Sequence, residues 1–261
     1  MKGNELARIH PSAIVSEKAT LGEGVTIGAG AIVYDNVVIG DGSVVGPYCI
    51  IGEPVASFYR NEAYENPPLH IGRGALIRSH SVVYAGSTIG DRFECGHRVT
   101  IRESSTIGAN CRIGTLSDIQ GFCRVGDYVR LHSNVFVAQK SVLGNYVWIF
   151  PYTVLTNDPH PPSSVLYGPI VEDFAVLATM VVVLPGVRIG QDALVGAMSL
   201  VRSDVPAEAV VVGSPAKVVG TVRQIRSRES GEPVYPWREH FDRGMPWENI
   251  GYERWREGCD S

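Results

Sequence analysis

Branched aliphatic residues recur at every sixth position along most of this chain of 261 residues. The recurring positions form three runs, within residues 9–51, 71–155 and 171–201, and Cys95 is the one member that is not aliphatic. A fixed short period is the signature of a solenoid, in which each repeat packs only on its neighbours. The period therefore predicts one elongated all-β domain.

Two further positions of the repeat are also restricted. A small or β-branched residue usually stands four positions after the aliphatic residue, and glycine is frequent directly after it. Branched residues suit a strand, and we expect the glycines to turn the corners with positive φ. Three such units make one triangular coil, so residues eighteen apart are predicted to be vertical neighbours. The prism should have about ten coils and a length of roughly 45 Å.

Two insertions interrupt the period, at residues 52–70 and 156–170, and the second is rich in proline. Loops that leave a rigid scaffold often carry binding groups. We assign residues 1–220 to the solenoid domain and residues 221–261 to an aromatic-rich C-terminal tail. We expect the tail to be partly helical and to pack on the end of the prism or on a neighbouring subunit.

Composition argues against several classes of protein. The net charge of −4 offers no basic surface for nucleic acid. No apolar run reaches the roughly 18 residues of a membrane span, and the N-terminus lacks the pattern of a signal peptide. Four of the five cysteines take inward positions of the repeat. Free core thiols are typical of a reducing compartment, so we expect a cytoplasmic protein.

The repeats, with the endings VVVLPGVRIG, ALVGAMSLV and VVVGSPAKVVG, resemble the left-handed parallel β-helix acyltransferases over residues 9–220. The stretches IRESSTIG, IGTLSDIQ, VRLHSNVFVAQK and VLTNDPHPPS resemble in particular the N-acetyltransferases of dTDP-3-amino-3,6-dideoxyhexoses. The resemblance implies the left-handed coil, acetyl-CoA or another acyl-CoA as donor, no metal, and a dTDP- or UDP-linked amino sugar as acceptor. It also implies a homotrimer whose active sites lie between subunits.

Three alternatives stay open. The opening IHPSAIVSEKATLGEGVTIG also resembles the UDP-N-acetylglucosamine O-acyltransferases of lipid A synthesis. The γ-class carbonic anhydrases share the architecture but bind zinc through three histidines, and no histidine pair here has the H-x4-H spacing. A non-catalytic scaffold is the third alternative, and it predicts no polar column on an edge of the prism.

Stacking by eighteen aligns two columns of corner residues on different edges. One column ends where the second insertion begins, and it runs Ala85, Glu103, Gly121, Gln139, Asn157. The other places a histidine where glycine dominates, and it runs Arg78, Gly96, Gly114, His132, Phe150. We predict His132, Gln139 and Asn157 as catalytic residues that meet between neighbouring subunits. His132 is expected to act either as a base or as a binding residue.

Residues on the middle coils are assigned to the nucleotide sugar, namely Glu103, His97, His80, Arg78 and Arg102. The resemblance implies that backbone groups of Ala178 and Gly196, at equivalent corners one coil apart, hydrogen-bond the pantetheine arm of coenzyme A. Pro215 is expected to pack against adenine, and Lys217 to meet a phosphate. No metal site is predicted.

Overall fold

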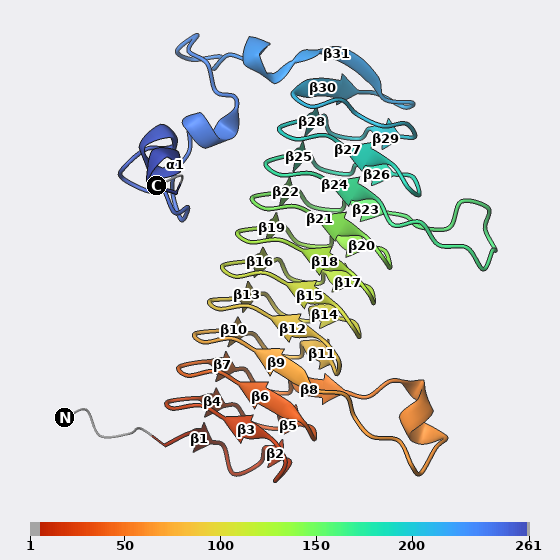
Figure 1. The fold of residues 1–261 in the computed structure, drawn as a ribbon, viewed down its shortest axis with the longest axis vertical. Helices are drawn as coiled ribbons and strands as arrows, with labels where there is room; N and C mark the ends of the chain where they lie inside the picture. The colour runs from red at the N-terminus through yellow and green to blue at the C-terminus, as the bar shows by residue number, and fades with distance from the viewer. Residues whose placement is uncertain (1–5, 260–261) are drawn as a thin grey trace.

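The computed structural model describes residues 6–259, and the fold is the predicted left-handed parallel β-helix with about eleven turns (Figure 1). Residues 1–5 of the predicted solenoid domain and residues 260–261 of the tail lie outside the described part. Very short strands form three sheets, one on each side of the prism. We call them sheets A, B and C, and we name each edge of the prism by the two sheets that it joins in chain order.

Sheet A has twelve strands. They are β1 (Arg8–Ile9), β4 (Thr26–Ile27), β7 (Val44–Val45), β10 (Leu76–Ile77), β13 (Glu94–Cys95), β16 (Arg112–Ile113), β19 (Arg130–Leu131), β22 (Trp148–Ile149), β25 (Val176–Leu177), β28 (Leu194–Val195), β30 (Ala209–Val212) and β31 (Lys217–Thr221). All neighbours are parallel except β30 and β31, which close the prism as an antiparallel pair.

Sheets B and C have ten and nine strands. Sheet B contains β2 (Ile14–Val15), β5 (Ile32–Val33), β8 (Ile50–Glu53), β11 (Val82–Tyr84), β14 (Thr100–Ile101), β17 (Asp118–Ile119), β20 (Phe136–Val137), β23 (Val154–Leu155), β26 (Val182–Val183) and β29 (Leu200–Val201). Sheet C contains β3 (Thr20–Leu21), β6 (Val37–Ile39), β9 (Leu69–Ile71), β12 (Thr88–Ile89), β15 (Thr106–Ile107), β18 (Arg124–Val125), β21 (Val142–Leu143), β24 (Ile170–Val171) and β27 (Arg188–Ile189).

The strand register confirms that residues eighteen apart are vertical neighbours. Cys95 pairs with Ile113, and Ile113 pairs with Leu131. From Ile27 on, the six-residue aliphatic positions are almost completely buried and form one continuous core. Burial of branched side chains along the whole axis stabilises each coil through its two neighbours.

The predicted role of the glycines is wrong. Positive φ falls three residues after the aliphatic position, as at Asn134 with φ 60°, whereas the glycines directly after it lack positive φ, except Gly52 among the described residues. Close approach of coils explains these glycines instead. A Cβ on Gly40 would lie 2.7 Å from the amide nitrogen of Arg73 in the next coil. The corner therefore excludes a side chain because of a neighbour, not because of its own dihedral angles.

Both insertions leave the same edge of the prism, edge B–C (Figure 1). The first runs over residues 54–68 between β8 and β9 and contains the short 3₁₀ helix η1 (Ala56–Tyr59). The second runs over residues 156–169 between β23 and β24. The two loops are therefore separated along one edge, with several regular coils between them.

The C-terminal tail turns back from β31 and lies beside sheet A, not on the end of the prism as expected (Figure 1). It contains the 3₁₀ helices η2 (Val222–Gln224) and η3 (Trp237–Glu239) and one α-helix, α1 (Tyr252–Cys259). Trp247 of the tail is fully buried in an aromatic cluster with Phe174. Within residues 6–259, no helix is both long enough and apolar enough to cross a membrane.

Candidate active site

The predicted polar column on edge B–C exists as a vertical stack. The amide of Phe122 donates to the carbonyl of Glu103 over 3.0 Å, and a Cβ on Gly121 would lie 3.1 Å from Oε1 of Glu103. At the upper end, Nδ2 of Asn157 donates to the carbonyl of Gln139 over 3.3 Å. The stack therefore connects the middle coils with the second loop.

Arg102 and Glu103 form a closed ion pair at the lower end of this stack. Nε and Nη2 of Arg102 donate to the two carboxylate oxygens of Glu103 over 2.7 and 3.0 Å. The hydrogen bonds that Arg102 donates to Glu103 raise the pKa of Arg102, and its guanidinium lies 4.9 Å from the ring centroid of Tyr84. Because its guanidinium is already paired with Glu103, Arg102 is less available to the nucleotide sugar to which we assigned it.

The side-chain amides of Gln139 and Asn157, nearer the C-terminal end of the stack, make fewer hydrogen bonds. Within the described part of the chain, no protein group bonds the side-chain amide of Gln139, and none bonds Oδ1 of Asn157. The Asn157 backbone is fixed, because its carbonyl accepts the amide of Tyr167 over 2.8 Å. These two amides can therefore donate to and accept from a polar ligand placed against edge B–C.

Asp118 is a polar residue of this edge that sequence reasoning missed. It points outward from β17 beside the stack, where Nε2 of Gln120 donates to its Oδ2 over 2.8 Å. Its Oδ1 is buried and has no hydrogen-bond partner in the structure, and burial raises the pKa of the carboxyl. The same eighteen-residue alignment would have found it, because its vertical neighbours Thr100 and Phe136 are uncharged.

His132 lies on edge A–B, in the second predicted column. Its ring stacks on Phe150 with centroids 4.4 Å apart, and burial lowers its pKa, so that the imidazole is neutral near pH 7. Its carbonyl accepts the buried hydroxyl of Ser117 over 2.8 Å, which fixes the corner. A hollow of about 210 Å³ is lined by four members of this column, namely Arg78, Gly96, Gly114 and His132.

The other two candidate histidines lie lower on edge A–B and outside that hollow. Nδ1 of His97 is 2.8 Å from the hydroxyl of Ser79, and His80 packs against Tyr48 with centroids 5.3 Å apart. Among residues 6–259, no three His, Cys, Asp or Glu side chains come close enough to hold a metal ion.

The candidate coenzyme A residues lie on the upper coils, where the amides of Ala178 and Gly196 already bond within the coil ladder. The amide of Ala178 donates to Val195 over 2.9 Å, and that of Gly196 donates to Val211 over 2.8 Å. The corner amides one residue further on, those of Thr179 and Ala197, have no acceptor among the described residues. Pro215 and Lys217 are both exposed at the C-terminal end of the prism. Pro215 lies between β30 and β31, and Lys217 is the first residue of β31.

The described site can now be compared with known proteins. Residues 18–53 and 96–139 match the family described as bacterial transferase hexapeptide (six repeats). Both matched segments consist of the six-residue repeat described above. The second matched segment of this hexapeptide-repeat protein contains Glu103, His132 and Gln139.

A curated relative is 2,3,4,5-tetrahydropyridine-2,6-dicarboxylate N-acetyltransferase of Staphylococcus aureus (strain JH9), which is 39% identical over 84 residues. The match covers 32% of the hexapeptide-repeat protein, which spans about a third of the length of the curated relatives it matches (34%).

Two solved structures share the fold. The UDP-N-acetylglucosamine acyltransferase from Campylobacter jejuni has a TM-score of 0.54 and 20% identity, over 85% of this chain and 79% of that chain. The Arabidopsis UDP-N-acetylglucosamine acyltransferase has a TM-score of 0.53 and 21% identity, over 82% and 74% of the two chains. At these identities the likeness concerns the β-helix alone.

Proposed function

We propose that this hexapeptide-repeat protein is an acyl-CoA-dependent N-acyltransferase whose acceptor is the amino group of a nucleotide-linked amino deoxysugar. The observation that supports this proposal most is the polar stack on edge B–C. There the side chains of Gln139 and Asn157 have amide groups open to a ligand, and the stack ends at the second loop. A polar stack of this kind argues against a non-catalytic scaffold. The named N-acetyltransferase relative supports transfer to nitrogen.

The chemistry needs a neutral amine, a route for its proton and a leaving thiol. In the proposed reaction the amine nitrogen attacks the thioester carbonyl, the C–S bond breaks, and coenzyme A leaves as the thiol. His132, which burial keeps neutral, can accept the amine proton as a base and then pass it to the departing sulfur. In the alternative role His132 only binds the sugar, and the proton passes from the amine to the departing sulfur. Gln139 and Asn157 orient the sugar in either case.

A site between two subunits follows from the positions of the two columns. His132 lies on edge A–B and Asn157 on edge B–C, so the two side chains of one chain face different directions. A homotrimer in which edge A–B of one subunit meets edge B–C of the next would bring them together. The trimer is therefore part of the proposal.

Release of free coenzyme A thiol tests the function directly. Acetyl-CoA with dTDP- and UDP-linked amino sugars should give turnover, whereas the corresponding hydroxy sugars and long-chain acyl-carrier-protein thioesters should not. The reverse preference would identify an O-acyltransferase and refute the proposal. Asn157→Ala and Gln139→Ala should each lower kcat by about 10²-fold or more without changing the melting temperature. Gln191→Ala is the matched control, because Gln191 takes the same repeat position on edge C–A.

Mixed trimers test the shared site. His132→Gln and Asn157→Ala should each keep only a small residual activity alone. Random reassembly of an equal mixture should restore about a quarter of wild-type activity, because a quarter of the interfaces then carry both native residues. A mixture that keeps only this residual activity after verified subunit exchange would place both residues outside a shared site.

A further inference from the structure

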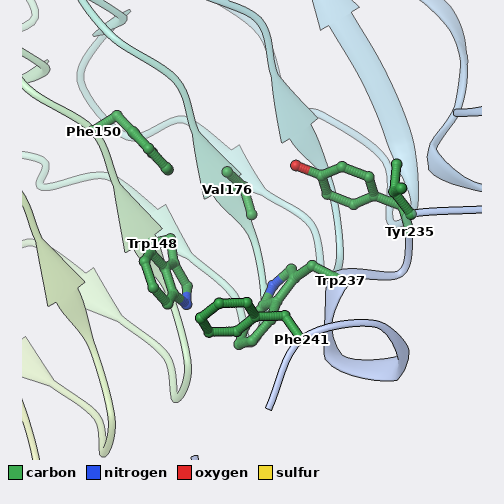
Figure 2. A pocket seen from close by; sticks show the side chains of 7 residues that line it. Trp148, Phe150, Val176, Tyr235, Trp237 and Phe241 are labelled. Atoms are coloured by element: carbon green, nitrogen blue, oxygen red, sulfur yellow. The ribbon is translucent and has the colours of Figure 1, made fainter. Parts of the chain in front are cut away.

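The tail and sheet A form a cleft that, of the site residues discussed so far, only His132 and Phe150 line. Its first part is an apolar hollow of about 250 Å³. Trp148 and Phe150 line it from the prism, and Tyr235, Trp237 and Phe241 line it from the tail (Figure 2). The rings of Trp148 and Phe241 stand nearly perpendicular, with centroids 5.6 Å apart. Aromatic walls of this kind suit a flat, unsaturated ring.

The second part of the cleft is cationic and has a volume of about 470 Å³. It shares Trp148 and Phe241 with the apolar hollow, so the two parts adjoin. Arg112, Arg130 and Arg243 line it, and Glu248 is the one acidic residue in that lining. A cavity with this excess of positive charge favours an anionic group next to the aromatic walls.

Two of these arginines are vertical neighbours, and the carboxylates near them do not neutralise both positive charges. Arg112 and Arg130 are register partners on β16 and β19, an arrangement in which like charges destabilise the sheet. Arg112 meets Glu94 at 3.5 Å, with both side chains largely exposed. Among residues 6–259, the guanidinium of Arg130 bonds only backbone carbonyls, those of Asn110 and Gly244. Burial and the nearby Arg112 lower the pKa of Arg130.

Trp148 adds a donor without a partner at the boundary between the two parts. Its Nε1 is buried and has no hydrogen-bond acceptor in the structure. Buried N–H groups are normally paired in folded proteins. By contrast, the indole N–H groups of Trp237 and Trp247 donate to the carbonyls of Phe174 and Phe241 over 2.8 and 3.0 Å. The unpaired group thus belongs to Trp148, which lines both parts of the cleft.

We infer that this cleft binds a nucleoside diphosphate group, with its base in the aromatic hollow and its phosphates at Arg112 and Arg243. Stacking on aromatic rings holds a base of any sequence identity, and guanidinium groups bind phosphate oxygens in pairs. Trp148, which lines both parts of the cleft, is placed between the base and the phosphates. Both co-substrates of the proposed reaction carry a nucleoside diphosphate group. Which of the two occupies the cleft is a question that rests on the proposed function, whereas nucleotide binding itself does not.

Calorimetric titration of the full-length protein tests the inference. UDP and dTDP represent the acceptor, while ADP and coenzyme A represent the donor. One of the two pairs should bind at least ten-fold more tightly than pyrophosphate alone or the free nucleosides, and that pair identifies the source. Arg112→Gln and Trp148→Phe should each raise its Kd by about ten-fold. Arg124→Gln, which replaces the exposed arginine at the same repeat position on sheet C, should leave the Kd unchanged.

Two outcomes would overturn the inference: no nucleotide binds, or nucleotides bind equally to the wild type, Arg112→Gln and Trp148→Phe. Acetyl transfer to amino sugars alongside such a result would leave the proposed function intact. If nucleotide binding depends on Arg112 but the protein transfers no acetyl group, the inference would stand and the proposed function would fail. The two proposals can therefore fail separately.

Discussion

One buried ion pair fastens the tail to the prism, and its removal should detach the tail. Arg238 of η3 pairs with Asp192 at edge C–A, and their side chains are only 11% and 4% exposed. The guanidinium also lies 4.8 Å from the ring centroid of Phe174 and 5.1 Å from that of Tyr252. The pair thus lies inside the aromatic cluster and links two parts of the chain that are 46 residues apart.

Arg238→Met should weaken tail docking by about 3–5 kcal/mol, because it leaves the Asp192 carboxylate buried without its cation. This free energy corresponds to roughly a 10²- to 10⁴-fold smaller docking constant. The double variant Asp192→Asn/Arg238→Met should recover most of the loss, since neither side chain is then an unpaired buried charge. Arg256→Met is the control, because Arg256 and Glu253 form an exposed pair on α1 that should contribute at most about 1 kcal/mol.

Tryptophan fluorescence reports docking separately from the β-helix. All four tryptophans of the chain, Trp148, Trp237, Trp247 and Trp255, belong to the tail cluster. In urea, Arg238→Met should shift the fluorescence transition to lower concentration while the far-UV circular dichroism transition stays near the wild-type midpoint. Coincident transitions at the wild-type midpoint would refute the clamp. A double variant as weak as Arg238→Met would refute the charge argument.

Other outcomes depend on single side chains. Gly40→Ala should cost about 1–3 kcal/mol in urea unfolding, because its Cβ would lie 2.7 Å from the Arg73 amide nitrogen; Gly42→Ala, with φ 66° and open space, should cost about 1 kcal/mol, and equal costs would contradict the close-approach argument. Asp118→Asn should stabilise the protein by about 1 kcal/mol at pH 7. Because burial raises the pKa of Asp118, the wild-type penalty should fade as pH falls through that pKa, and an advantage unchanged at pH 4 would contradict this. If His132 is the base, its lowered pKa places the acidic limb of the kcat profile below about pH 6.5, and His132→Gln should abolish that limb; an unchanged limb would make His132 a binding residue.

The vertical alignment of residues in the prism was predictable from the sequence, because it depends only on the number of residues in one coil. Once three six-residue units make a coil, Glu103, Gln139 and Asn157 must stack, and the hydrogen bond from Asn157 to Gln139 confirms this at the upper end. The same reasoning placed four residues of the His132 column around one hollow. The period does not fix which partner a side chain bonds, so Arg102 was assigned to the nucleotide sugar although its guanidinium is paired with Glu103.

The position of the tail was not predictable, because the period ends before the tail begins. Its contacts join segments far apart in the sequence, such as the bond from Trp237 Nε1 to the Phe174 carbonyl across 63 residues. One signal was present nonetheless. Outward positions of sheet A eighteen residues apart read Arg112, Arg130 and Trp148, and this change from charged to aromatic marks where the tail covers the sheet.

The repeat also limits where this protein can recognise a ligand. Corner amides such as those of Ala178 and Gly196 are used by the coil ladder, and the side chains at the aliphatic and small positions are buried. Specific recognition therefore falls to corner side chains, to corner amides outside the ladder such as those of Thr179 and Ala197, and to the segments that leave the repeat. Both loops border the stack that ends at Asn157, and the tail converts one face of sheet A into a cleft beside His132. Chains that share the prism but differ in these segments should therefore differ in substrate while keeping the same coil geometry.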